Sequence, residues 1–375
     1  MIAIIMRSIP ICKFRERGPD AAQATRGRIV QRVSITFAHR GHACVLALSL
    51  ASVAIPVHPQ ERVTSPPEFK LSTAVGSAYP LGRAGERWAQ LINDGAAGAF
   101  EVRTYPGATL AQRDPASELG VLRDGGAELA VGAALSWSVQ LPELGVYAMP
   151  WLAPGSRELE ALAANAALQE QVAARMADAG VVALAVAPLG ERVLATVKSP
   201  IETPAACAGL RVRVLPQRSV VDVYRALGAQ PQTMAFAQAQ RAFAAGELDG
   251  QDAQPSTLVA TRAFASGQKF VTRWGAFADV MFFAVRKASW DAWPDPRRRM
   301  VRAAAQQAAQ EANAIAREEA ALAELTRQGV TIVRLSSVQR AALREMAQPA
   351  IAEWTSAVGA DLAALARAAV ATGVK

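Results

Sequence analysis

Histidine and cysteine are scarce in this chain of 375 residues, and most of both lie near its start. All three histidines and two of the three cysteines fall within the first 60 residues, so Cys207 is the only residue of either type beyond them. Without histidine, the rest of the chain cannot form a Ser-His-Asp triad, a Cys-His pair or a histidine-rich zinc site. A single thiol excludes a disulfide within it, and no glycine-rich phosphate loop of either common spacing occurs. We therefore expect no metal and no cofactor.

Acidic residues are few at the start of the chain. The first 60 residues hold eight basic residues against two acidic ones, a net +6, whereas the remaining 315 hold 32 against 30, a net +2. The formal net charge of +8 thus comes mostly from the start. This balance gives no reason to expect nucleic acid as a partner of the rest of the chain. A hydrophobic fraction of 51% excludes wholesale disorder.

Long hydrophobic runs are missing except for one at residues 43–55, which follows Arg40. Its length and its small residues, such as Ala54, are typical of a secretory signal peptide, and it is short for a membrane span. We expect residues 1–54 to be a signal peptide and the protein to be periplasmic. The arginine-rich start is unusual before such a signal, which a true start near Val30 would explain. An uncleaved membrane anchor is the alternative.

Beyond the leader, apolar runs of strand length alternate with amphipathic stretches, which indicates an α/β fold. Residues 181–187 are continuously apolar, as in a strand covered on both faces. A long helix is predicted over residues 294–328, where Gly329 ends it. No flexible linker separates the parts, so we expect two lobes joined by crossing strands, with a cleft between them. Lobe I is assigned residues 65–189 plus 282–320, and lobe II residues 190–281 plus 321–375.

Three arginines stand in otherwise apolar strand segments. Arg192 opens one of them, and Arg211 and Arg213 alternate with valines in another, which places both on one face of that strand. A buried guanidinium is costly unless it is paired, and its planar fork suits a carboxylate. These arginines are either anchors for an anionic ligand or members of solvated faces and structural ion pairs.

An ordered set of short motifs surrounds these arginines. They are residues 104–107, 122–125, 149–152, 209–216, 227–231, 234–236, 246–251, 285–290 and 293–295. In this order and spacing they resemble the solute receptors of tripartite ATP-independent periplasmic (TRAP) transporters, of the DctP type. The resemblance covers nearly all of residues 65–370.

The resemblance implies a periplasmic binding protein with two α/β lobes that close on a small organic acid and deliver it to membrane permease subunits. In such receptors an arginine of the strand motif pairs with the carboxylate of the solute, and that position falls on Arg213. A second arginine about twenty residues earlier corresponds to Arg192, and Phe236 corresponds to an aromatic residue of the pocket. The resemblance implies neither an enzyme nor a partner nucleic acid.

The sequence departs from the family pattern beside these positions. After Gln251, an amide that often holds the ligand is replaced by Ala253, and Gln254 is the candidate substitute. Further candidates are Gln251 itself, Tyr79, at the mouth of the first strand-to-helix turn, and Trp137. Trp274 and Asp279 lie where the second crossover reaches the pocket, although a core tryptophan and a surface carboxylate are equally open. The pocket is thus expected to be less polar, and to take a simple or aromatic monocarboxylate, a 2-oxo acid or a dicarboxylate.

Two other functions stay open on the sequence. One is an exported enzyme that works with carboxylates alone, for which Asp249 and Asp252 are the nearest pair. The other is a ligand-sensing lobe of a signalling system, which would share the same pocket.

Overall fold

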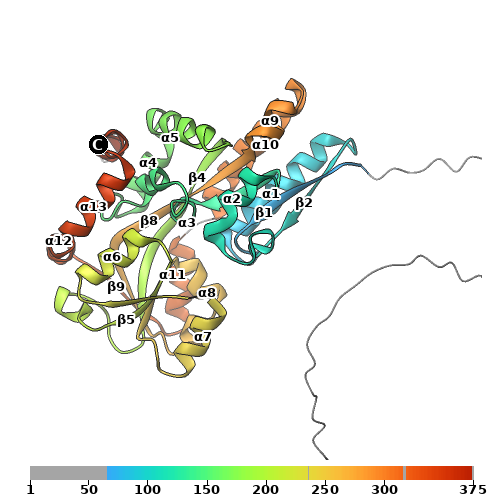
Figure 1. The fold of residues 1–375 in the computed structure, drawn as a ribbon. Helices are drawn as coiled ribbons and strands as arrows, with labels where there is room; N and C mark the ends of the chain where they lie inside the picture. The colour runs from blue at the N-terminus through green and yellow to red at the C-terminus, as the bar shows by residue number, and fades with distance from the viewer. Residues whose placement is uncertain (1–65, 235, 316–317, 374–375) are drawn as a thin grey trace, which may run out of the picture. The chain divides into compact units, whose positions relative to one another are not determined.

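The computed structural model describes residues 66–234, 236–315 and 318–373. The predicted signal peptide over residues 1–54 lies outside them, and so does the side chain of Phe236. Within these ranges strands alternate with helices, and the strands join in one nine-stranded sheet (Figure 1). The prediction of an α/β fold is therefore confirmed.

The strands pair in the order β2-β1-β3-β8-β4-β7-β5-β6, and β9 pairs with β8. Their bounds are β1 Glu68–Thr73, β2 Glu101–Tyr105, β3 Leu129–Ala133, β4 Val181–Thr196, β5 Arg211–Val214, β6 Gln230–Thr233, β7 Gly250–Ala253, β8 Phe270–Arg286 and β9 Thr331–Arg334. Pairs on either side of the centre are parallel, β1 with β2 and β3 and β5 with β6 and β7. Parallel pairs need crossover connections, which the helices supply.

The helices of the first half are α1 Pro80–Ala96, α2 Glu118–Asp124, α3 Ala134–Trp137, α4 Ser156–Ala164, α5 Ala166–Asp178, α6 Arg218–Ala226 and α7 Phe236–Ala244. Those of the second half are α8 Pro255–Ala260, α9 Lys287–Ala292, α10 Asp295–Ile315, α11 Glu318–Arg327, α12 Ser337–Met346, α13 Gln348–Val358 and α14 Ala360–Gly373. The long helix predicted over residues 294–328 corresponds to α10 and α11. None of the helices in the described ranges is long and apolar enough to cross a bilayer.

Two long antiparallel strands, β4 and β8, form the centre of the sheet (Figure 1). One end of β8 pairs with β3, and the opposite end of β4 pairs with β7. The sequence predicted separate strands before and after Gly190, but the structure has one strand of 16 residues. The pairing register shifts between Pro188 and Gly190, where Gly190 has a φ of 125°. A bulge at this point lets the strand continue through a proline, which cannot donate a ladder hydrogen bond.

Two large apolar clusters stabilise the sheet. Beside β1 and β2, α1 packs against α10, and Trp88 meets Phe283 edge to face with ring centroids 5.5 Å apart. A larger cluster contains Trp274, Phe277 and Trp354, and α13 packs there against α6. This larger cluster reaches from Ala130 on β3 to Val212 on β5, so it packs along both long strands, β4 and β8.

Candidate functional site

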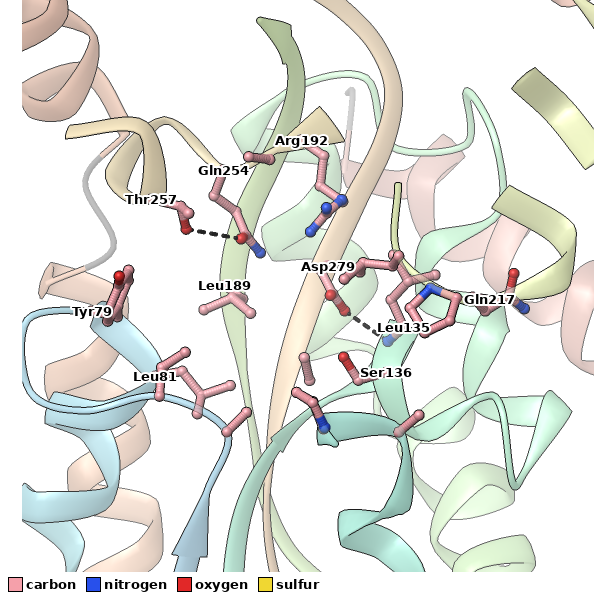
Figure 2. Close-up of a pocket in the computed structure, with 18 of the residues that line it drawn as sticks. Tyr79, Leu81, Leu135, Ser136, Leu189, Arg192, Gln217, Gln254, Thr257 and Asp279 are labelled. Atoms are coloured by element: carbon pink, nitrogen blue, oxygen red, sulfur yellow. Dashed lines mark hydrogen bonds between the residues drawn. The ribbon is translucent and has the colours of Figure 1, made fainter. Parts of the chain in front are cut away.

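A cavity of about 520 Å³ lies beside β4 and β8, a volume within the usual range for a small-molecule site. Its wall combines segments that are far apart in the sequence (Figure 2). Residues that line it include Tyr79, Leu81, Leu135, Ser136, Leu189, Arg192, Arg213, Leu215, Gln217, Gln254, Thr257 and Asp279. A little over half of all the residues that line the cavity have apolar side chains, and the polar side chains come mainly from β4, β5 and β8 and from the starts of helices.

Arg213 enters the cavity from β5. Its strand alternates, with Val212 and Val214 fully buried on one side and the two arginines on the other. The Arg213 guanidinium makes only two long hydrogen bonds, from Nε and Nη2 to the carbonyl oxygen of Met234, at 3.4 and 3.5 Å. Burial, together with the smaller effect of the positive charge of Arg192, lowers the pKa of Arg213 to about 10. Among the described residues, no carboxylate forms an ion pair with it.

Arg211 lies on the same strand in a different environment. Its Nε and Nη2 donate to the two carboxylate oxygens of Asp249 at 2.8 and 2.9 Å, and Nη2 also donates to the carbonyl of Gly246 at 2.8 Å. This pairing lowers the pKa of Asp249 to about 2. Arg211 is therefore already neutralised by the protein, and it does not belong to the residues that line the cavity.

Arg192, on β4, lines the cavity and is also paired from behind. It is 4% exposed and forms an ion pair with the fully buried Asp252 of β7, through Nε and Oδ1. Its Nη2 donates to the backbone carbonyl of Asp252 at 3.0 Å, and the hydroxyl of Tyr224 donates to Asp252 Oδ2 at 3.0 Å. This network fixes the guanidinium at the cavity wall and compensates its charge.

Asp279 is buried on β8 and lines the cavity near Arg192 (Figure 2). Its Oδ1 accepts hydrogen bonds from the backbone N–H groups of Leu135 and Val280, at 3.1 and 2.9 Å. Its Oδ2 has no hydrogen-bond partner within the described ranges. Burial raises the pKa of Asp279 to about 7, and the charge of Arg192 opposes that shift. The interpretation of Asp279 as a surface carboxylate is wrong, since the side chain is 1% exposed.

Two other predicted residues lie at the cavity wall, at the starts of helices. Gln254 precedes α8, and its Oε1 accepts a hydrogen bond from the Thr257 hydroxyl at 3.5 Å (Figure 2). Tyr79 precedes α1, where its extended backbone leads into Pro80. Both positions bring a polar side chain to the cavity because helices start at this edge of the sheet.

Three predicted residues do not line the cavity. Trp274 is fully buried in the core, with its ring centroid 5.3 Å from that of Tyr224. Trp137 is also fully buried and stacks on Phe282 at 6.4 Å. Gln251 is buried, and its Nε2 donates to Gln268 at 2.7 Å. The structure does not describe the side chain of Phe236, which opens α7.

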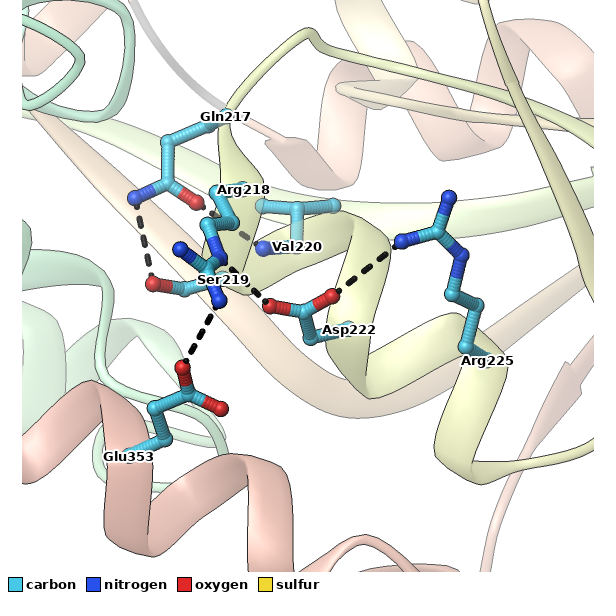
Figure 3. Close-up of polar contacts among 7 residues, drawn as sticks. All are labelled: Gln217, Arg218, Ser219, Val220, Asp222, Arg225 and Glu353. Carbon is cyan, nitrogen blue, oxygen red and sulfur yellow. Dashed lines mark hydrogen bonds and ion pairs between the residues drawn. The ribbon is translucent and has the colours of Figure 1, made fainter.

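Gln217 lines the cavity, although the sequence did not single it out. It caps α6, because its Oε1 accepts a hydrogen bond from the N–H of Val220 at 2.9 Å (Figure 3). The next residue, Arg218, contacts Asp222 in the same helix and Glu353 in α13 (Figure 3). These contacts tie the start of α6 to the C-terminal helices. The sequence could have indicated Gln217 only through its position, because it directly follows Pro216 at the end of the strand motif that contains Arg213.

In the part of the chain that the structure describes, no group of three or more His, Cys, Asp or Glu side chains is placed to hold a metal ion. The polar groups at the cavity are three guanidiniums, two carboxyls, two amides and several hydroxyls. Such a set can bind an organic anion through charge and directed hydrogen bonds.

Comparisons with known proteins point to one family. The family model described as "Bacterial extracellular solute-binding protein, family 7" (DctP) matches residues 71–357. The C4-dicarboxylate-binding periplasmic protein DctP of Rhodobacter capsulatus is 27% identical over 333 residues, which cover 88% of this chain and 96% of that protein. A TRAP periplasmic solute-binding protein from Ralstonia eutropha H16, solved with bound (S)-2-acetolactate, is 33% identical, with a TM-score of 0.78 over 81% of this chain and 99% of that one.

The same fold occurs in a TRAP solute-binding protein from Shewanella oneidensis solved with succinate, which is 20% identical with a TM-score of 0.74 over 81% of this chain and 99% of that one. The two-lobe fold and the resemblance predicted from the sequence are therefore confirmed. This chain belongs to the DctP family, the extracellular solute-binding proteins of family 7 that serve as solute receptors of TRAP transporters.

Proposed function

We propose that this receptor binds the carboxylate of a small organic acid at Arg213 and delivers the acid to the permease subunits of a TRAP transporter, without chemical turnover. The observation that carries the proposal is the Arg213 guanidinium itself. It is half-buried at the cavity, its two hydrogen bonds to the protein are long, and no described carboxylate pairs with it. A desolvated charge of this kind gains most from a ligand that brings the opposite charge.

Arg192, Gln254, Tyr79, Gln217 and Asp279 complete the proposed site. Arg192 adds positive charge, but its pairing with Asp252 leaves less of it for a ligand. Gln254 and Gln217 supply amide groups at the starts of α8 and α6. The phenol of Tyr79 lies across the cavity from the long strands (Figure 2). We assign Arg213 the anchoring role and these residues the orientation of the rest of the solute.

The wall favours a compact solute with an apolar part. Leucines at positions 81, 135, 189 and 215 line the cavity, so a solute with many hydroxyl groups would leave several of them without partners. The Ralstonia relative, at 33% identity, was solved with a branched hydroxy-oxo acid of five carbons. A short monocarboxylate with one or two polar substituents fits both observations.

The proposed location and lobe boundaries come from the sequence. A signal peptide at residues 1–54 would export the chain to the periplasm, where a receptor of this family meets its permease. Residues 65–189 plus 282–320 would form lobe I, and residues 190–281 plus 321–375 lobe II, with β4 and β8 passing between them. The carboxylates of the enzymatic alternative, Asp249 and Asp252, are each in an ion pair with an arginine, so that alternative gains no support.

A thermal-shift screen tests the function. The probes are (S)-2-acetolactate, 2-hydroxybutanoate, 2-oxobutanoate, benzoate and succinate, with lactamide and benzamide as uncharged controls. A ligand that binds only the native state raises the melting temperature, and at a hundred times its Kd it adds about 2.7 kcal/mol of stability. We expect at least one carboxylate, and neither amide, to raise the melting temperature. If the amides act as well as the acids, or no acid acts, the proposal is wrong.

A further inference from the structure

The proposed function gives Asp279 a part in orienting the solute, and the surroundings of its side chain point to a more specific role. Asp279 is 1% exposed, and its Oδ1 is held by two backbone N–H groups, from α3 and from its own strand. Asp279 lines the cavity, and its Oδ2 is buried and has no partner in the described ranges. An oxygen in this situation either stays an unsatisfied charge or carries a proton. Because Asp279 lines the cavity, a solute held there lies beside its carboxyl group.

The charges around Asp279 can be counted element by element. Arg192 on β4 and Arg213 on β5 are positive, and Asp252 on β7 is negative and paired with Arg192. The neighbour of Arg192 on β4, Glu191, pairs with Arg273. From α3, Asp279 meets the uncharged Leu135 and Ser136.

At the rim, Arg113 and Asp114 are both exposed and opposite in charge, so they cancel. With Asp279 ionised, the charges at the cavity therefore sum to zero, and with Asp279 protonated they sum to +1. Only the protonated form leaves a net positive charge that a single carboxylate neutralises.

We propose, on the basis of the proposed function, that Asp279 binds the solute as a neutral carboxylic acid, so that a monocarboxylate enters the cavity together with one proton from solvent. The proton goes to Oδ2, which then donates a hydrogen bond to an oxygen of the solute, while Oδ1 keeps its two backbone donors. No other bond forms or breaks. Asp279 thus selects monocarboxylates against dicarboxylates, because a second negative charge would face an apolar wall and a carboxyl group.

The ionisation of the free receptor supports this assignment. Burial raises the pKa of Asp279 to about 7 before any ligand is present. An anion bound beside it adds a negative charge, which raises that pKa further. At pH values above 7 the free receptor must therefore take up a proton when the anion binds, and its affinity must fall as the pH rises.

Calorimetry with 2-hydroxybutanoate and (S)-2-acetolactate tests the proton. We expect the affinity of the wild type to fall about tenfold between pH 7.5 and pH 8.5. Titrations in phosphate and in Tris, which differ in ionisation enthalpy, should show uptake of about one proton per ligand at pH 8.5. Affinity that does not change with pH, without proton uptake, would overturn the inference and leave the proposed function intact. Failure of both acids and the other carboxylate probes to bind would overturn both.

Asp279→Asn tests the residue. The amide oxygen can still accept from Leu135 and Val280, and the amide N–H₂ replaces the protonated Oδ2 as a donor. We expect this variant to bind the monocarboxylates with no pH dependence and no proton uptake. Glu118→Gln is the matched control, because burial also raises the pKa of Glu118 to about 7 while its side chain lies outside the cavity lining. It should keep the pH dependence. If Asp279→Asn keeps it as well, or Glu118→Gln loses it, the proton is not on Asp279.

A pair of probes tests the selectivity on the wild type. The inference can therefore be refuted even if Asp279→Asn does not fold. Malate differs from 2-hydroxybutanoate only in a carboxylate that replaces the terminal methyl group. We expect 2-hydroxybutanoate to bind at least tenfold more tightly at pH 7.5. Tighter binding of malate would contradict the assignment of the cavity to monocarboxylates.

Discussion

The buried pair of Arg192 and Asp252 supports a quantitative prediction for Asp252→Asn. Arg192 is 4% exposed and Asp252 is fully buried, and Asp252 also accepts a hydrogen bond from Tyr224 at 3.0 Å. Asparagine has nearly the same shape, so the substitution removes charge and little volume. It leaves the Arg192 guanidinium buried without its compensating carboxylate, which typically costs about 3–5 kcal/mol. We expect the free energy of unfolding to fall by that amount.

Urea unfolding followed by tryptophan fluorescence measures this loss, because the ring of Trp274 lies 5.3 Å from that of Tyr224. The midpoint should fall at an unchanged m value, which would locate the effect in the native state. Asp291→Asn is the matched control, since Asp291 pairs with Lys287 on an exposed helix surface where such pairs contribute at most about 0.5 kcal/mol. If the free energy of unfolding of Asp252→Asn falls by less than about 1 kcal/mol, then Arg192 is not a buried charge that depends on Asp252 for compensation, which refutes this interpretation of the pair.

The same substitution changes the site in a predictable direction. Without the negative charge of Asp252, the positive charge of Arg192 becomes available to an anion at the cavity wall. Carboxylate affinity should therefore be retained or rise, although the fold is weaker. A variant that loses both stability and all binding would show that Asp252 positions Arg192 for the ligand, and not merely compensates its charge.

Three further predictions follow from individual side chains. Glu118→Gln should reduce the pH dependence of stability. Burial raises the pKa of Glu118 from 4.5 to about 7, so between these pH values the carboxyl keeps its proton in the folded chain and loses it in the unfolded chain. The free energy of unfolding of the wild type therefore falls by about 3 kcal/mol as the pH rises through this interval, as urea midpoints at pH 5 and pH 8 would show. A wild type whose midpoint rises over this interval would contradict the sign. Gly132→Ala should lower the free energy of unfolding by about 1–3 kcal/mol and change the near-ultraviolet circular dichroism, because the new Cβ would lie 1.9 Å from Trp137 Cε2. Gly76→Ala is the control: its new Cβ has its nearest neighbour at 4.0 Å, so it should leave both the stability and the spectrum unchanged. Arg211→Gln should leave carboxylate binding unchanged, because Arg211 is paired with Asp249 away from the cavity, and calorimetry with the same probes would check it.

The sequence predicted the elements of the fold well where apolar patterns were long. Residues 181–187 are part of β4, and the alternation of Arg211, Val212, Arg213 and Val214 is the burial pattern of β5. The continuation of β4 through Pro188 and Gly190 was missed, because proline and glycine are typical of strand ends. Only the pairing with β8 shows that a bulge carries the strand on.

The candidate site was harder to predict than the fold. Period two puts Arg211 and Arg213 on one face, and nothing local distinguishes them. The difference arises from Asp249, which lies 38 residues further along the chain and pairs with Arg211. Likewise, Trp274 and Asp279 lie on one strand within five residues, yet the first is packed in the core and the second lines the cavity. Such outcomes depend on strand pairing and helix packing, which a single sequence does not specify.

The most direct test of the anchor is the Kd of one carboxylate, (S)-2-acetolactate or the tightest acid of the screen, for Arg213→Gln measured beside Arg211→Gln. The two arginines lie on the same face of one strand, but only Arg213 lines the cavity, and only Arg211 is paired with a carboxylate, that of Asp249. Comparing the two variants therefore isolates the contribution of an unpaired guanidinium at the cavity. Loss of a desolvated charge pair costs about 2–5 kcal/mol. We predict a Kd at least about 30-fold weaker for Arg213→Gln and unchanged for Arg211→Gln. Equal affinity of Arg213→Gln and the wild type would contradict the account.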